Sequence, residues 1–317
     1  MPKVSVIVPI YCVEQYIEKC VRTLFSQTLT DIEYIFVDDC SPDLSINILK
    51  SLIREFSLKL ERENKVVKLF TMSENSGQAA VRKFAVQHAT GDFIIHCDSD
   101  DWVEADMYQA MYDEAVNSST DIVICDFYQS SRNGEKYIKS CNNSDSKKKL
   151  IYDFMTGRGY WSLCNKLVRR SLYDDQLIRY PEGNMGEDMV IILQLIHYAR
   201  KVSYIEKGYY HYYVNPSSIV RDNSEENILR KFTQVVENVR IIEVFLKHKY
   251  SGILYNFSLD SLKYRQLNIL NPLKGDERIN NLWRNTFSDI KYRIWLNPYI
   301  RWQNKVKFYM RILNLFN

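Results

Sequence analysis

The sequence predicts an α/β protein with a mostly parallel, doubly wound sheet and a helical C-terminal appendage. Up to about residue 130, short apolar runs alternate with amphipathic segments of helical period, which is typical of βαβ units. Beyond residue 225 the pattern is helical and rich in Tyr, Trp, Lys and Arg. A chain of 317 residues can hold one large domain and an appendage. We therefore predict an α/β domain over 1–222 and a helical region over 223–317.

The individual elements follow from this periodicity. We expect the first strand over 4–9, ended by Pro9 because proline cannot donate to a central ladder. Four further strands are expected, at 32–37, at 66–71, from Phe93 up to Asp98, and at 122–127. Helices are expected at 14–27, 45–60, 78–89 and 105–117. The polar segment 129–149 reads as an exposed, mobile loop. A helix at 150–155, an extended segment at 161–168, a helix at 189–199 and strands at 202–205 and 209–213 follow.

The charge distribution and the cysteine content limit the possible partners and the cellular location of the protein. The net charge of +3 conceals an asymmetry, since residues from Arg230 onward include sixteen Lys and Arg against six Asp and Glu. These basic residues are spread among apolar ones, so we expect no nucleic-acid partner. The seven cysteines form no C-x-x-C pair, and no secretory signal pattern precedes residue 4, so reduced thiols and a cytoplasmic location are expected. No apolar stretch approaches 18 residues, so no spanning helix is expected.

Acidic residues follow the strand that starts at Phe93. Asp98, Asp100 and Asp101 lie within four positions, and the second strand similarly ends in Asp38 and Asp39. Ligands of open α/β sheets bind at the carboxyl ends of strands. Crowded carboxylates raise one another's pKa unless they share a cation. Asp98 and Asp100 therefore suggest one Mg²⁺ or Mn²⁺ ion, completed by water and a diphosphate. The alternative is a solvated turn that caps a helix.

Two other nucleotide- or phosphate-binding classes fit less well. A dinucleotide-binding site needs a G-x-G-x-x-G turn after its first strand, and residues 9–14 contain no glycine. Phosphatases of the haloacid dehalogenase type also use a D-x-D motif, but at the end of the first strand. Here the motif follows the fourth predicted strand.

Six motifs in order give a more specific signal, at residues 4–11, 33–43, 75–82, 91–101, 165–171 and 186–188. With them the chain resembles family 2 inverting glycosyltransferases of the GT-A nucleotide-diphospho-sugar transferase fold, of the bacterial polysaccharide-biosynthesis type. The resemblance covers about residues 3–220. It implies metal-dependent, inverting transfer of a hexose from a UDP-sugar to a saccharide or lipid-linked saccharide acceptor. The expected context is the assembly of a surface polysaccharide, such as a capsule, exopolysaccharide or O-antigen.

The resemblance assigns the nucleotide site to the first strand ends. Asp39 would accept the imide N–H of uracil in a charge-assisted bond. Pro9 and Tyr11 would shape the base pocket, with the Tyr11 ring against the nucleoside. Glu14 would lie near the nucleotide, or it is a first-turn helix acid favoured by the macrodipole. Arg82 would reach a phosphate or the ribose, or it is a solvated helix charge.

The same resemblance divides the D-x-D acids among different roles. Asp100 is the expected direct ligand of Mn²⁺ or Mg²⁺, and Asp98 would contact the metal or the ribose. Asp101 is expected to cap a helix. Lys166 would point at the diphosphate. The ion would neutralise the departing UDP.

Inverting transfer needs a base that accepts the proton of the attacking hydroxyl. The family's catalytic acid corresponds to Asp188, which must be ionised at rest, and Glu187 would hold an acceptor hydroxyl. The alternative is that this acidic pair only caps the helix over 189–199.

The C-terminal segment 298–317 has an apolar helical stripe with basic residues mostly off it; the stripe is formed by Trp302, Val306, Tyr309, Leu313 and Phe316. Such a helix suits the anionic inner face of the cytoplasmic membrane. Alternatively, the stripe docks on the catalytic domain or on a second subunit, as in a homodimer. The Q-x-x-R-W segment of processive members is absent, so one sugar per encounter is expected.

Two rival functions remain at this stage. A non-catalytic nucleotide-sugar-binding or scaffold subunit would not require the acids at 39, 98, 100 and 188. A sugar-1-phosphate nucleotidyltransferase should have a glycine-rich, lysine-containing loop after its first strand, and residues 9–14 are not such a loop.

Overall fold

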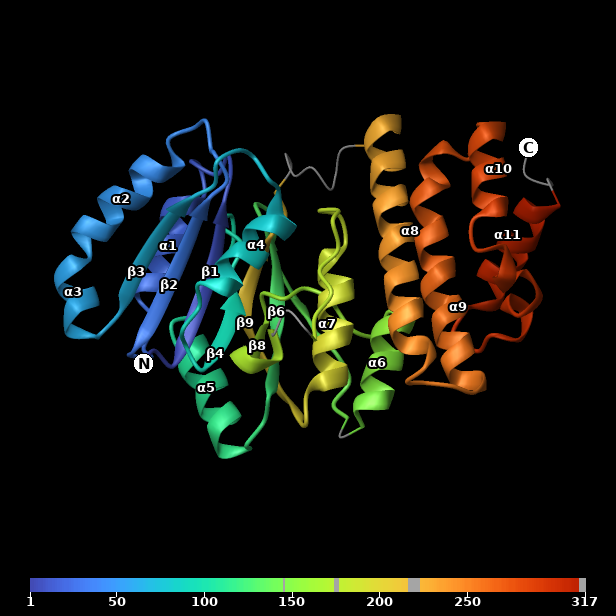
Figure 1. Ribbon diagram of the computed structural model, residues 1–317. Helices are drawn as coiled ribbons and strands as arrows, with labels where there is room; N and C mark the ends of the chain where they lie inside the picture. Colours follow the sequence, from blue (N-terminus) through green and yellow to red (C-terminus); the bar gives the residue numbers. More distant parts are fainter. Residues whose placement is uncertain (145, 174–176, 216–222, 314–317) are drawn as a thin grey trace. The chain divides into compact units, whose positions relative to one another are not determined.

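The computed structural model describes residues 1–144, 146–173, 177–215 and 223–313. These residues form two compact units (Figure 1). The first consists of Met1–Lys147 and Trp161–Asn215, and the second of Lys148–Tyr160 and Pro216–Asn317. The segment 148–160 thus belongs with the C-terminal helices, whereas the sequence had assigned it to the first domain. The predicted boundary at 222 lies outside the described residues.

The first unit is built on one mixed sheet with the strand order β3-β2-β1-β4-β8-β6-β9-β5, and β7 pairs with β6 beyond this path. The parallel half contains β1 (Val4–Ile10), β2 (Ile32–Asp38), β3 (Val66–Thr71) and β4 (Phe93–His96). The other half contains β5 (Trp102–Val103), β6 (Ile122–Ser131), β7 (Gly134–Ile138), β8 (Lys166–Arg169) and β9 (Val202–Tyr213). Strand β8 runs antiparallel to both β4 and β6 and so joins the two halves.

Helices cover both faces of this sheet. On one face a continuous apolar core joins the strands to α1 (Ile17–Phe25), α2 (Ser45–Glu55), α3 (Ser57–Arg62) and α5 (Met107–Asn117). Helix α4 (Gln78–Gln87) lies on the opposite face (Figure 1). Helix α7 (Glu187–Tyr198) begins after the left-handed Gly186, whose φ is 80°. Burial of β1 and β2 on both faces explains their continuous apolar sequences.

Several sequence expectations were wrong in detail. Strand β1 includes Pro9, which pairs with Val37 in register, instead of ending there. The segment 129–149 is not a loop throughout, because β6 continues to Ser131 and forms a hairpin with β7. The two strands expected between 202 and 213 are the single strand β9. The helix expected over 45–60 is divided at Phe56 into α2 and α3.

The second unit is helical. Its helices are α8 (Glu225–Lys247), α9 (Ile253–Leu267), α10 (Glu277–Asn285) and α11 (Trp302–Ile312). Residues 148–156 of α6 (Lys147–Thr156) belong to the same unit. Three short 3₁₀ helices lie between α9 and α11 in the chain, namely η3 (Asn268–Leu273), η4 (Ser288–Tyr292) and η5 (Ile294–Leu296). They enclose a second apolar core that includes Trp283 and Phe308. Over the described residues, no helix is long and apolar enough to cross a bilayer.

Candidate active site

The candidate site lies where the parallel strands end. Strands β1 and β2 run in register up to Ile10 and Asp38, and the Asp39 amide donates to the Ile10 carbonyl over 2.9 Å. Strand β4 pairs with the other side of β1 and leads directly into Asp98. The sheet thus brings Tyr11, Asp39 and Asp98 to one edge, as the sequence predicted.

Asp39 is fixed by the loop that precedes α4. Its two carboxylate oxygens accept the backbone N–H groups of Ser76 (2.7 Å) and Gly77 (2.8 Å). Gly77 has a φ of 81°, which strongly favours glycine. Each carboxylate oxygen can accept a further hydrogen bond. A uracil imide can therefore still be accommodated while the loop is held.

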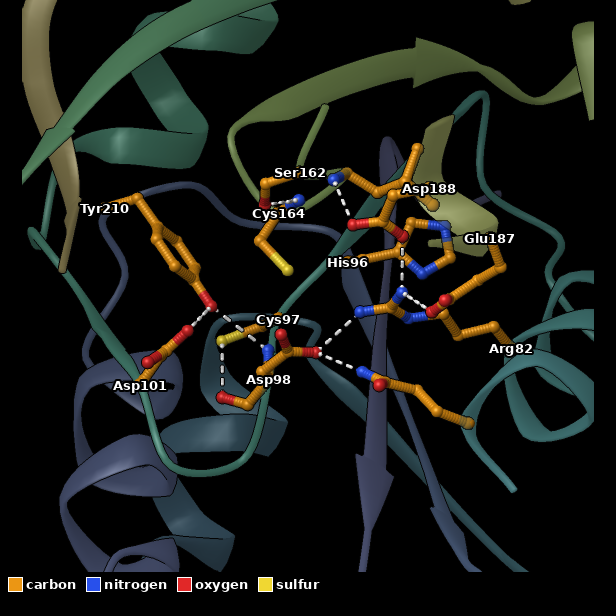
Figure 2. A network of polar contacts seen from close by, with 12 residues as sticks. Arg82, His96, Cys97, Asp98, Asp101, Ser162, Cys164, Glu187, Asp188 and Tyr210 are labelled. Atoms are coloured by element: carbon orange, nitrogen blue, oxygen red, sulfur yellow. Dashed lines mark hydrogen bonds and ion pairs between the residues drawn. The ribbon is translucent and has the colours of Figure 1, made fainter. Parts of the chain in front are cut away.

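Arg82 on α4 is the centre of a buried charge network (Figure 2). Its Nη2 donates to Asp98 Oδ1 over 2.7 Å, and its Nη1 donates to Glu187 Oε1 (2.8 Å) and Asp188 Oδ1 (2.6 Å). Only 2% of the Arg82 side chain is exposed. One guanidinium therefore connects the D-x-D motif to the acidic pair at the start of α7. The structure thus places Arg82 differently from the predicted contact with phosphate or ribose, and it is not a solvated helix charge.

One positive charge faces three carboxylates in this network. Burial and the neighbouring Asp188 raise the pKa of Glu187 to about 8, against the opposing effect of Arg82. Burial also raises the pKa of Asp188, which Arg82 counteracts and Asp98 reinforces. The Asp188 carboxylate accepts the Leu163 amide over 3.3 Å in addition. Glu187 and Asp188 open α7, as the capping alternative requires, but their side chains are committed to Arg82 and Leu163.

The D-x-D acids have separate surroundings. Asp98 Oδ1 also accepts Gln78 Nε2 over 3.0 Å, and the Asp98 amide donates to the Tyr210 hydroxyl over 3.1 Å. Among the described side chains, Asn215 makes one long contact with Asp100, from its Nδ2 at 3.4 Å. Burial, followed by the charge of Asp98, raises the pKa of Asp100 to about 6.

Asp101 is not a helix cap, and that prediction was wrong. Its carboxylate accepts the Tyr210 hydroxyl and, over 2.6 Å, the Tyr213 amide. Helix α5 begins later, at Met107. Burial and the neighbouring acids raise the pKa of Asp101 well above its usual range. Asp101 therefore fastens the D-x-D turn to strand β9 (Figure 2).

Asp98 and Asp100 fit a divalent metal as a pair. Their oxygens are hard ligands suited to Mg²⁺ or Mn²⁺. No group of three or more His, Cys, Asp or Glu side chains arranged for a metal occurs within the described ranges. An ion held here would therefore draw further ligands from water and from a diphosphate.

The remaining predicted residues occupy different positions. Tyr11 is exposed beyond β1, in a position open to a base, and Pro9 lies within β1. Glu14 Oε2 accepts the Leu44 amide over 3.0 Å, so Glu14 connects to the start of α2. Because α1 begins at Ile17, Glu14 is not a first-turn acid of that helix.

Lys166 lies inside the protein. Its ammonium donates to the Ser162 carbonyl over 2.5 Å and to Asn165 Oδ1 over 2.8 Å, and its side chain is fully buried. Burial lowers its pKa to about 8. In this arrangement Lys166 does not face the open edge of the site, where we had predicted a diphosphate contact.

Three supporting groups were missed by sequence reasoning, namely Gln78, Tyr210 and the Leu163 amide. Gln78 and Arg82 are four residues apart and reach the same Asp98 oxygen, because that spacing places both on one face of α4. The i,i+4 spacing was visible in the sequence. The segments that carry Leu163 and Tyr210 are distant in sequence from the acids they contact, so spacing alone does not predict these two contacts.

Comparison with known proteins identifies the family. The family model described as glycosyl transferase family 2 matches residues 5–177, more than half of the chain. The putative glycosyltransferase EpsH of Bacillus subtilis is 34% identical over 227 residues, which is 69% of this chain and 63% of EpsH. Glycosyltransferase GlyA of Streptococcus pneumoniae is 29% identical over 69% of this chain, but the match covers only 32% of GlyA. The chain thus spans less than two thirds of these relatives.

Solved structures show the same fold. The S. aureus TarS 1-349 structure in complex with UDP-GlcNAc aligns with 99% of this chain and 90% of that chain, with a TM-score of 0.61 and 19% identity. The mannosyltransferase PcManGT from Pyrobaculum calidifontis, in complex with GDP-Man and Mn²⁺, aligns with a TM-score of 0.53 and 15% identity. The fold, the converging acids and the match over residues 5–177 lead to one conclusion: the chain belongs to glycosyl transferase family 2.

Proposed function

We propose that the chain is a metal-dependent, inverting glycosyltransferase. It transfers a hexose from a UDP-sugar to a saccharide or lipid-linked saccharide acceptor during the assembly of a surface polysaccharide such as a capsule, exopolysaccharide or O-antigen. The observation that carries the proposal is the Arg82 network. It joins Asp98 of the D-x-D motif to Asp188 through contacts of 2.7 and 2.6 Å. Acids more than 80 residues apart in sequence are thus held in one site.

The donor half of the proposed site uses the strand ends. Asp39 accepts the uracil imide, and Pro9 and Tyr11 flank the base. Asp98 and Asp100 would hold Mn²⁺ or Mg²⁺, which as a Lewis acid would neutralise the charge of the departing diphosphate. The TarS structure with UDP-GlcNAc supports a uridine donor, and the PcManGT structure with Mn²⁺ supports the metal.

Three further residues were predicted to contact the donor, namely Glu14, Lys166 and Arg82. Glu14 is exposed near the end of β1 and remains a candidate for the nucleotide. A diphosphate contact by Lys166 would require its buried ammonium to leave Ser162 and Asn165. Arg82 acts as a positioning residue in this proposal, since its donors are directed at carboxylates.

The acceptor half uses the start of α7. Asp188 takes the proton of the acceptor hydroxyl as that oxygen attacks C1 of the sugar and the bond to UDP breaks. Glu187 holds an acceptor hydroxyl beside it. The Leu163 amide and Arg82 both favour the charged form of Asp188 and so oppose the rise in its pKa that burial causes.

The donor site is tested by titrating the protein with UDP in the presence and absence of Mn²⁺. We expect saturable binding that requires the metal, and its loss in Asp100→Ala. Asp92→Ala is the matched control, since it removes an exposed carboxylate just before the other end of β4. UDP binding that ignores the metal, or equal binding by Asp100→Ala, would remove the metal assignment. A parallel titration with GDP examines the choice of base.

The base is tested by Asp188→Asn. The variant should bind UDP as the wild type does and lose transfer by about 10²–10⁴-fold, the usual contribution of a general base. Retained turnover would exclude Asp188 from this role. A wild-type protein that binds UDP with Mn²⁺ but transfers nothing to any saccharide acceptor would support the non-catalytic, nucleotide-sugar-binding subunit instead.

The location is part of the proposal. We place the chain in the cytoplasm, held at the inner face of the cytoplasmic membrane by the basic segment 298–317. Trp302 and Leu313 of the predicted stripe are strongly exposed, and Phe316 lies outside the described residues. The buried side of α11 is instead formed by Phe308 and Arg311. A homodimer through the same exposed stripe is the competing arrangement.

A further inference from the structure

A cavity of about 470 Å³ lies wholly within the C-terminal unit. Its walls come from α9, α10, α11 and the segment of η3 that follows α9. The charged side chains in its lining are all cationic: Lys274, Lys307 and Arg311. Four asparagines and three aromatic residues complete the lining, and no acid is found among the described residues that line it.

Arg311 is the buried cation of this cavity. Its Nε donates to Asn280 Oδ1 over 3.0 Å, and its Nη1 donates to Asn271 Oδ1 over 2.8 Å. The guanidinium lies over the Trp283 ring, 4.7 Å from its centroid. Among the described residues, its Nη2 has no hydrogen-bond partner, and only 8% of the residue is exposed. Two amides and a ring thus fix the guanidinium, while Nη2 meets no acceptor within the described part of the chain.

The charge of Arg311 also has no acid opposite it. Over the described residues, no carboxylate forms an ion pair with Arg311, whereas the similarly buried Lys263 pairs with Glu243 and Asp289. Burial and the nearby Arg284 lower the pKa of Arg311 to about 10. A buried cation is normally paired, because an isolated charge loses its hydration without compensation. An anionic ligand would provide that pairing.

A second unpartnered donor lies in the same wall. Trp283 is 3% exposed, and its buried Nε1 has no acceptor among the residues that the structure describes. Lys274 and Lys307 are exposed residues of the same lining, so they can reach a ligand from the solvent side. The cavity therefore combines a guanidinium held by two amides, the ammonium groups of two exposed lysines and an indole N–H.

We propose that this cavity binds a phosphoryl group carried by a sugar or a polyol. The planar guanidinium with lysines nearby suits the several oxygens of a phosphate ester. The asparagine amides and aromatic walls suit the hydroxyls and apolar faces of a polyol or sugar. The volume exceeds what a bare phosphate needs. The site is separate from the donor site of the first unit and does not rest on the function proposed above.

The test uses the full chain and soluble probes. We expect glycerol 3-phosphate and glucose 1-phosphate to bind one to one by calorimetry, and glycerol and glucose not to bind. The double variant Lys274→Gln/Lys307→Gln should weaken phosphate-ester binding at least tenfold. Arg301→Gln is the matched control, since it removes an exposed charge just before the same helix and does not line the cavity. No saturable binding, or equal binding by the double variant, would overturn the proposal.

A second variant gives an independent check. Phosphate esters should raise the melting temperature of the wild type and leave that of Arg311→Met unchanged. An equal rise in Arg311→Met would exclude the cavity as the site. If this variant does not fold, the lysine pair remains decisive, because both side chains are exposed.

The source of the phosphoryl group is resolved by competition. Vesicles that contain phosphatidic acid are mixed with the protein, and glycerol 3-phosphate is added. Displacement of bound protein identifies a lipid headgroup as the occupant, and retention identifies a soluble ester. Either result supports phosphoryl recognition when the lysine pair is required for ester binding. Binding of UDP in the same samples should be unaffected by the lysine variants.

Discussion

Arg82 sets the charge balance of the site at the scale of single residues. It is buried among Asp98, Glu187 and Asp188, and it supplies the hydrogen-bond donors that hold them together. We expect Arg82→Gln to lower the free energy of unfolding by about 3–5 kcal/mol, since removing one partner of a buried ion pair leaves uncompensated charges. Denaturant unfolding measures this loss. Arg22→Gln, which breaks the exposed bridges to Glu18 and Glu55, is the matched control and should change stability little.

The role of Arg82 as a positioning residue has its own readout. Because Arg82 favours the ionised form of Asp188, its loss should move the acidic limb of the pH–rate profile to higher pH. Arg82→Lys keeps the charge but cannot bridge three acids, so it should restore part of the stability and little of the rate. An Arg82→Gln enzyme with normal rate and an unshifted pH profile would show that the network is only structural.

Glu187 makes stability depend on pH. Its pKa is about 8 in the folded protein, above its ordinary value of 4.5, so the folded state binds more protons than the unfolded state between these values. The contribution of Glu187 to the free energy of unfolding is therefore complete below pH 4.5. It is lost as pH rises from 4.5 through 8, by up to about 1.4 kcal/mol per pH unit. Glu187→Gln should remove the part of this dependence that Glu187 contributes, so the variant should be more stable relative to the wild type at pH 8 than at pH 5. Melting temperatures across that range measure it, and parallel curves for both proteins would contradict it.

At the scale of elements, the loop before α4 joins the nucleotide edge to the acidic edge. Gly77 donates to Asp39, has a φ of 81°, and lies so close to Asn184 that an added Cβ would be 2.0 Å from Asn184 Nδ2. We expect Gly77→Ala to cost about 1–3 kcal/mol of stability and to weaken UDP binding, because the loop must shift. Gly134→Ala is a useful control, since its φ is also positive and its Cβ would meet nothing within 4 Å. Equal UDP affinity in both variants would contradict the prediction.

Some elements of the fold could be predicted from the sequence, and others could not. Residues 66–71 were predicted as a strand with the observed bounds, because short apolar runs between helices carry their own signal. The hairpin of β6 and β7 was missed, since its exposed second strand is polar and is stabilised by pairing instead of burial. Asp98 and Asp188 were predicted as site residues, but the use of Arg82 to join them depends on α4 and α7 meeting in space. Periodicity does not encode that meeting.

At the scale of the whole molecule, charge and exposed apolar surface coincide in the C-terminal unit. Trp295 contacts Tyr309 with ring centroids 5.9 Å apart, and Lys305 donates to the Trp295 carbonyl over 2.8 Å, so η5 lies beside α11. Trp302 and Leu296 are 71% and 70% exposed there. The apolar side chains together with Arg301 and Lys305 form a surface suited to an anionic bilayer. Deletion of 298–317 is a poor test, because it removes buried Phe308 from the core.

Point variants of this surface test membrane contact directly. Binding to vesicles that contain phosphatidylglycerol should fall about tenfold in Trp302→Ser, which loses apolar burial. In Arg301→Gln/Lys305→Gln it should fall by about 1 kcal/mol for each charge. Val244→Ser is the control, since Val244 is 64% exposed on α8 and lies outside the patch. Sedimentation of the same variants distinguishes the alternatives: if Trp302→Ser dissociates a dimer and leaves vesicle binding intact, the surface joins two copies of the chain.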